Sequence, residues 1–510
     1  MKRAPLALLL TGAAASAQAA PNVRLTDSLT IERRVDNQNG DDGDDNYGVA
    51  INRLNLVGSD GGLSANARVD TIYFVNPPAT QASEGEYADD ARLERLSVRY
   101  RLGDWQIQVG DFYRQLGRGI VLSLRKVDEV GLDLTVQGGE VAWDTKDHAA
   151  ALFAGRVNAV NLDAVSQKFV DDPDDVLVGA EYTLRALGPL RLNVYGLYMG
   201  IEEPILASVS DDDHVFSGGL SAEIPDLFSF GSAYFEVDYQ RRELVGETFP
   251  GKAAYGAVEL FFGDYGLVAE GLYLDDFELR GSSNSALQNR FVYGQPPTLE
   301  RLDQEVLNNK DVLGGRLRVD RYLLEGDLAL YINGMYRITD QGESSQVDQL
   351  HGYAGFDLTY GEGASRLGLS AGYRDEKQPE LSDPDLKSMI HFEGDWLQAI
   401  SGGWSLHLSS TNELRTLKDD DYARGSTLLG VEAAGLGALT VELGYDTQKE
   451  GDNIRQFFYA TVLDWEAAEW MRARFTAGHQ RGGLKCIGGV CRIFPEFAGA
   501  RLDIITTLDL

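Results

Sequence analysis

The stretch Leu63-Ser-Ala-Asn-Ala-Arg-Val-Asp-Thr-Ile-Tyr-Phe-Val75 alternates between two kinds of side chain. Side chains of a β-strand point to opposite faces in turn, so this stretch predicts a strand with one apolar and one polar face. A strand with an apolar face that long needs an apolar neighbour, such as lipid. The apolar face would carry Leu63, Ala65, Ala67, Val69, Thr71, Tyr73 and Val75, and the polar face Ser64, Asn66, Arg68 and Asp70.

The same alternation recurs along the whole chain and predicts an all-β fold. Short glycine-containing connections such as Gly103-Asp104 and Gly188-Pro189 alternate with long ones such as 113–131 and 280–309. In lipid only a closed sheet satisfies every backbone donor and acceptor. We therefore expect a single antiparallel transmembrane β-barrel of about 24 strands, within a range of about 22 to 26, with short periplasmic turns and long extracellular loops. Among the expected strands are 63–75, 105–112, 132–144, 176–187 and 497–510.

The two ends of the chain indicate export to the bacterial outer membrane. Lys2 and Arg3 precede an apolar stretch that ends in Ala17-Gln18-Ala19, so residues 1–19 are expected to be a signal peptide and residues 20–510 the barrel. The final stretch places Leu502, Ile504, Leu508 and Leu510 on one face and resembles the last strand of outer-membrane barrels. The expected partners are therefore outer-membrane lipid and the barrel assembly machinery.

Charge and composition exclude other classes of protein. The formal net charge of -33 argues against nucleic-acid binding, and a mean hydropathy of -0.23 argues against a helical membrane protein.

Many of the acidic residues lie in runs within the long connections. These runs are interpreted as solvated loops, with divalent-cation binding as the alternative. They are Asp41-Asp42-Gly43-Asp44-Asp45, Asp171-Asp172-Pro173-Asp174-Asp175, Asp211-Asp212-Asp213 and Asp419-Asp420-Asp421.

Tryptophan and cysteine supply two further expectations. All six tryptophans lie near expected short turns, and because the indole ring prefers the membrane interface they predict an aromatic girdle on the periplasmic side. Cys486 and Cys491 bracket a short stretch in the last long loop, which in an exported chain favours a disulfide over free thiols. The girdle residues are Trp105, Trp143, Trp396, Trp404, Trp465 and Trp470.

One long connection, 110–126, differs from the others because it is basic and has an apolar centre, Ile120-Val-Leu122. It is expected to fold inward against the barrel wall. Its arginines and those on the lumen face of the strand before it would form one arc opposite lumen acids such as Glu236 and Glu270, as in a porin constriction. The alternative is that these charges pair across the lumen and seal it. The predicted pore-lining residues are Arg95, Arg99, Arg101, Arg114, Arg118 and Arg125.

The stretch from Gly110 to Lys126, continued through Val127 to Gly139, resembles a stretch in bacterial outer-membrane β-barrel proteins of an uncharacterised porin-like family. The resemblance implies fold and location, and it brings no substrate, cofactor or catalytic residue with it.

An enzyme is not expected. The six histidines are dispersed without a metal-ligand spacing, so no metal or cofactor is predicted. His407 and Ser410, the nearest pair for a barrel phospholipase, would lie on opposite strand faces. The leading hypothesis is an outer-membrane channel for polar or anionic solutes. The alternative is a structural barrel that acts as a sleeve or anchor for a protein partner in the cell envelope.

Overall fold

A computed structural model describes residues 22–36, 45–77, 87–163, 165–202, 213–284, 289–300, 310–381, 384–418, 420–448, 457–487 and 490–510. The side chains of residues 284, 289, 486, 487, 490 and 491 are not among those described. The expected signal peptide, residues 1–19, lies outside these ranges and stays a prediction. Most of the acidic runs also fall wholly or partly outside them.

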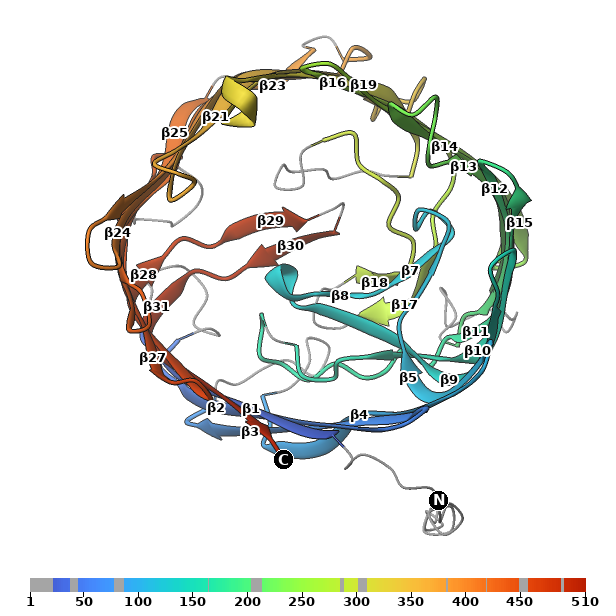
Figure 1. The fold of residues 1–510 in the computed structure, drawn as a ribbon, viewed down its shortest axis with the longest axis horizontal. Helices are drawn as coiled ribbons and strands as arrows, with labels where there is room; N and C mark the ends of the chain where they lie inside the picture. Colours follow the sequence, from blue (N-terminus) through green and yellow to red (C-terminus); the bar gives the residue numbers. More distant parts are fainter. Residues whose placement is uncertain are drawn as a thin grey trace.

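The chain forms a closed antiparallel barrel of 24 strands, as the alternating pattern predicts (Figure 1). Each barrel strand pairs with the next one along the chain, and pairing of the first with the last closes the ring. The strands are β1 (Asn22–Arg34), β2 (Gly48–Asp60), β3 (Leu63–Val75), β4 (Asp90–Leu102), β5 (Trp105–Phe112), β9 (Leu132–Asp144), β10 (His148–Ala159), β11 (Val176–Leu187), β12 (Leu190–Gly200), β13 (His214–Ile224), β14 (Gly231–Leu244), β15 (Glu247–Phe262), β16 (Tyr265–Asp275), β19 (Val312–Leu323), β20 (Leu328–Thr339), β21 (Val347–Tyr360), β22 (Ser365–Lys377), β23 (Asp385–Ile400), β24 (Trp404–Leu417), β25 (Asp420–Ala433), β26 (Gly437–Asp446), β27 (Phe457–Ala468), β28 (Met471–Gln480) and β31 (Phe497–Asp509).

Short turns lie at one end of the barrel and the long connections at the other, also as predicted. The long connections carry short strands that lie inside the ring in Figure 1. Because no neighbouring barrel strand is free, these strands pair mainly with one another as hairpins. They are β6 (Arg114–Leu116), β7 (Leu122–Leu124), β8 (Lys126–Val127), β17 (Arg280–Asn284), β18 (Asn289–Val292), β29 (Gly483–Ile487) and β30 (Val490–Phe494); two 3-10 turns, η3 (Asp128–Val130) and η4 (Leu324–Gly326), complete the secondary structure.

The two faces of the wall follow the period-two pattern of the sequence. On β3, Tyr73 is 59% exposed and points outward, whereas Asp70 is 3% exposed and points into the lumen. Leucine, valine and aromatic side chains occupy outward positions on strand after strand. The outer surface is therefore apolar, as contact with lipid requires.

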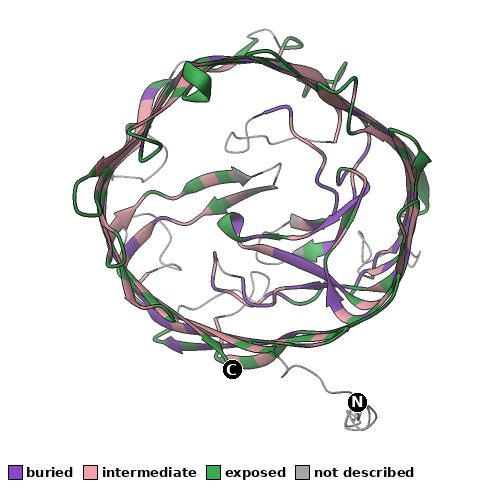
Figure 2. Cartoon of the chain, viewed as in Figure 1, coloured by how far each residue is buried: buried purple, intermediate pink, exposed green. Residues whose placement is uncertain are grey.

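The packed core lies inside the barrel, between the interior segments and one arc of the wall. Figure 2 shows the buried residues on these segments and on the wall beside them. The larger apolar cluster joins β6 and β7 to the inner faces of β9 to β16. A smaller one joins β2 and β3 to the connection after β10 through Val49, Phe74 and Leu162. Hydrophobic burial thus holds the long connections in the lumen.

Candidate functional site

The connection that follows β5 turns back into the barrel as the hairpin of β6 and β7. Its apolar side chains pack against inward-facing wall residues that include Phe153, Leu177 and Met199. The inward fold expected from the apolar centre of this segment is therefore confirmed. The hairpin residues Leu116, Ile120, Val121, Leu122 and Leu124 are each at most 1% exposed.

A buried carboxylate on the wall fixes the turn of this hairpin. Glu236 accepts hydrogen bonds from the hydroxyl groups of Tyr195 at 2.6 Å and Tyr234 at 2.5 Å, and from the backbone N–H of Arg118 at 2.8 Å. Gly117 has φ +55°, and a Cβ there would lie 2.1 Å from Glu236 Oε1, so a side chain does not fit. The turn carries the guanidinium of Arg118 to 4.4 Å from the ring centre of Tyr234.

The six arginines predicted to line the pore are not gathered in one arc. Arg95 is buried against the wall and donates to the carbonyl oxygen of Asp133 at 3.0 Å. Arg114 forms ion pairs with Glu140 at 3.1 Å and Glu181 at 2.5 Å. On the lumen face of β4, Arg99 and Arg101 donate to glutamine side chains of β5, namely Gln108 and Gln106.

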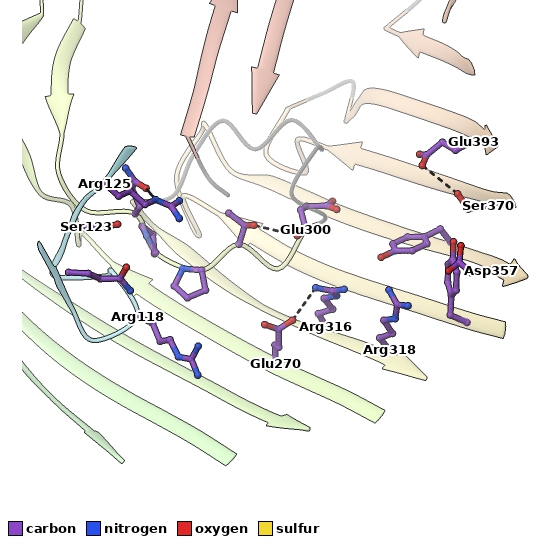
Figure 3. A pocket seen from close by; sticks show the side chains of 17 residues that line it. Arg118, Ser123, Arg125, Glu270, Glu300, Arg316, Arg318, Asp357, Ser370 and Glu393 are labelled. Atoms are coloured by element: carbon purple, nitrogen blue, oxygen red, sulfur yellow. Dashed lines mark hydrogen bonds and ion pairs between the residues drawn. The ribbon is translucent and has the colours of Figure 1, made fainter. Parts of the chain in front are cut away.

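Only Arg118 and Arg125 of those six line a common cavity, which has a volume of about 710 Å³. The cavity lies between the β6–β7 hairpin, a second interior segment at 295–300 and the inner faces of β16 and β19 to β23 (Figure 3). Glu270, expected as a lumen acid, also lines it. Its further lining residues include Arg316, Arg318, Glu300, Tyr331, Tyr353, Asp357, Ser370 and Glu393.

Most of the charges around the cavity are already paired. Arg316 lies 3.2 Å from Glu270, and Arg318 pairs with Asp320 at 2.7 Å. Arg125 donates to the side-chain oxygen of Gln295 at 2.6 Å. The sequence leaves pairing among lumen charges as the alternative to a constriction. Most of the charged residues around this cavity are paired in that way, but not all of them.

The second interior segment includes β17 and β18 and continues to residue 300. It is held by Asp175, which is fully buried. One carboxylate oxygen accepts from the hydroxyl of Tyr293 at 2.6 Å and the backbone N–H of Ser282 at 2.8 Å. The other accepts from the hydroxyl of Ser282 at 2.6 Å and the backbone N–H of Glu202 at 3.1 Å. Burial, followed by the negative charge of Asp175, raises the pKa of the Tyr293 hydroxyl well above its ordinary value. This part of an acidic run is therefore an internal anchor and not a solvated loop.

Two histidines of the wall lie at the end of this segment, where one of them contacts Glu300. The imidazoles of His351 on β21 and His391 on β23 face each other with 3.0 Å between their Nε2 atoms. Nδ1 of His351 lies 2.8 Å from Glu300, and Nδ1 of His391 lies 3.1 Å from Glu393. Burial alone would raise the pKa of Glu300, but the His351 hydrogen bond and the charges of Arg374 and Arg337 lower it below its ordinary value.

Glu300 thereby ties the interior segment to two strands of the wall. Its contact with His351 reaches β21, and the contact between His351 and His391 extends the link to β23. Gln349, also on β21, donates to Glu300 at 2.7 Å.

Sequence reasoning missed the histidine chain and half of the cavity. His351 and His391 lie 40 residues apart and share a site only because β21 and β23 both neighbour β22. Arg316 and Arg318 could have been found, because they alternate with the outward Leu317 in the sequence of β19. Glu300 gave no signal, since its connection has no periodic pattern.

The periplasmic aromatic girdle and the disulfide stay predictions. The six tryptophans lie near the short turns, and Trp105 and Trp143 are register partners on β5 and β9. The backbone places Cys486 opposite Cys491 in the β29–β30 hairpin, but their side chains are not described and the disulfide stays a prediction. Within the described ranges, no group of three or more metal-ligating side chains and no helix able to span a membrane occurs.

Comparison with known proteins shows the fold and leaves the substrate open. Residues 392–508, less than half of the chain, match the model of a family of unknown function, DUF6029. No curated protein sequence matches the chain. A cryo-EM structure of the E. coli P pilus tip assembly intermediate PapC-PapD-PapK-PapG matches at 10% identity and a TM-score of 0.51, over 100% of this chain and 63% of that one.

Two crystal structures from Pseudomonas aeruginosa are also similar. The siderophore receptor PirA matches at 9% identity and a TM-score of 0.49, over 95% of this chain and 80% of that one. OccK8 (OprE) matches at 12% identity and a TM-score of 0.41, over 72% and 96%. The chain has the fold of bacterial outer-membrane β-barrel proteins.

Proposed function

We propose that this protein is an outer-membrane channel that passes polar solutes, with a preference for those that carry a negative charge. The observation that carries the proposal is the exposed positive charge of Arg118. Its guanidinium is exposed in the cavity, and within the described residues it forms no hydrogen bond and no ion pair. An exposed cation held in a lumen attracts anionic solutes.

The placement in the membrane is supported by the outward apolar side chains and by the tryptophans near the short turns. Indole rings favour the interface between lipid and water. The outer surface thus matches a band in contact with acyl chains that is bordered by an aromatic girdle. Polar residues line the inner face, as a path for hydrated solutes requires.

Replacing Arg118 by glutamate is expected to reverse the charge preference. At about 10 Å, one charge in water contributes roughly 0.4 kcal/mol, so a change of two charges alters the local concentration of each ion about fourfold at low salt. The reversal potential under a salt gradient in planar bilayers should therefore shift toward cation selectivity. Arg118→Lys is the control, because it keeps the positive charge at this position and should leave the reversal potential unchanged.

An unchanged reversal potential in Arg118→Glu, with the barrel shown to be folded, would remove Arg118 from the ion path. A folded wild-type barrel that gives no current would reject the channel. The sleeve or anchor would then become the better reading, with an envelope protein as the expected partner. The packing of the chain's own segments inside the barrel argues against that alternative, because they occupy space that a protein partner would need.

A further inference from the structure

The cavity contains a second charge without a partner, of the opposite sign to Arg118. Asp357 lies on the lumen face of β21 and is exposed. Across the described ranges, its carboxylate forms no hydrogen bond and no ion pair, whereas Glu270, Glu300 and Glu393 each have a basic partner. Among the residues that the structure describes, the cavity thus has one guanidinium and one carboxylate without a hydrogen bond or an ion pair.

These two charges stand apart and are held by different parts of the fold. Arg118 belongs to the interior hairpin, whose turn is fixed by Glu236, and Asp357 belongs to a wall strand. Figure 3 shows them at opposite sides of the cavity, with the paired residues Arg316 and Glu270 between them. Because the hairpin is buried in the core, Arg118 is not free to cross the cavity and neutralise Asp357.

We infer that the cavity binds a zwitterionic solute with separated charges, such as a short peptide with free ends. This inference rests on the proposed channel function and names its substrate class. The carboxylate of the solute pairs with Arg118, and its ammonium group pairs with Asp357. Three extended residues span about 10 Å, and a volume of about 710 Å³ accommodates a chain of that size. Tyr331 and Tyr353 also line this cavity.

A matched set of four peptides tests the pairing. Trialanine carries both charges, N-acetyl-trialanine only the negative one, trialanine amide only the positive one, and N-acetyl-trialanine amide neither. Binding to the purified full-length barrel is measured by saturation-transfer NMR, and uptake of the same labelled peptides is measured in proteoliposomes. We expect trialanine to bind at least threefold more tightly than any capped form.

The variants assign each end of the peptide. In Asp357→Asn, trialanine should bind no better than N-acetyl-trialanine, because the partner of the ammonium group is gone. In Arg118→Gln, it should bind no better than trialanine amide. Glu432→Gln is the matched control, since it changes the lumen charge as Asp357→Asn does but lies on β25, away from this cavity. It should leave the ranking of the four peptides unchanged.

The outcomes separate the inference from the channel function. Equal binding of all four peptides to the wild type, or an advantage of trialanine that survives Asp357→Asn, overturns the inference even if the peptides enter the vesicles. If the charge-matched binding pattern holds but no peptide enters, the site is supported and the channel is rejected. Loss of the advantage in Glu432→Gln as well would show a general charge effect and would also overturn the assigned pairing.

Discussion

Asp175→Ala is expected to release the second interior segment from the barrel while leaving the wall intact. The substitution leaves the hydroxyl groups of Tyr293 and Ser282 and the backbone N–H of Ser282 without an acceptor in a buried site. Each unsatisfied buried donor costs about 1 to 3 kcal/mol, so the local loss for these three donors is on the order of 3 to 9 kcal/mol. Hydrogen exchange in detergent should show a large loss of protection at the Tyr293 amide, which donates to the carbonyl oxygen of Leu279.

The neighbouring residue provides the matched control. Asp174 pairs with Arg156 at 3.2 Å, and both side chains are more than half exposed. An exposed pair contributes about 0 to 1 kcal/mol, so Asp174→Ala should change protection little. If the Tyr293 amide remained equally protected in Asp175→Ala, the buried carboxylate would not be the anchor that its four hydrogen bonds indicate.

Glu300→Ala is expected to release residues 295–300 of the second interior segment from the wall. Glu300 is 3% exposed; it accepts a hydrogen bond from the Gln349 side-chain amide at 2.7 Å and lies 2.8 Å from Nδ1 of His351. The substitution leaves both groups without this partner in a buried site. At about 1 to 3 kcal/mol for each group, the local loss is on the order of 2 to 6 kcal/mol.

Hydrogen exchange in detergent provides the measurement. The Gln295 amide, which donates to the carbonyl oxygen of Gly119, should exchange at least about tenfold faster in Glu300→Ala than in the wild type. Glu432→Ala is the control, because Glu432 lies 3.9 Å from His407 and its side chain is 44% exposed, so the Gln295 amide should keep its protection. Equal protection of this amide in Glu300→Ala would show that Glu300 does not hold the segment.

The sequence by itself determined the barrel. The strands expected at 63–75, 105–112, 132–144 and 176–187 have those bounds in the structure. Each side chain of a wall strand points either toward lipid or toward the lumen, so its polarity indicates its direction. The period of two can therefore be recognised in the sequence without knowing which strands are neighbours. The inward fold of the connection after β5 was readable for a related reason, since an apolar centre in a long loop has to be buried.

Only the tertiary structure decided which charges meet inside the barrel. Arg114 and Arg118 are four residues apart in one basic segment, yet the wall neutralises Arg114 with two acids, whereas Arg118 has no acidic partner among the described residues. Asp357 faces Arg118 across the cavity although 239 positions separate them in the sequence. The alternating pattern fixes the face of a residue but not its neighbours across the lumen, because those depend on barrel closure and on the path of interior segments that have no period of their own.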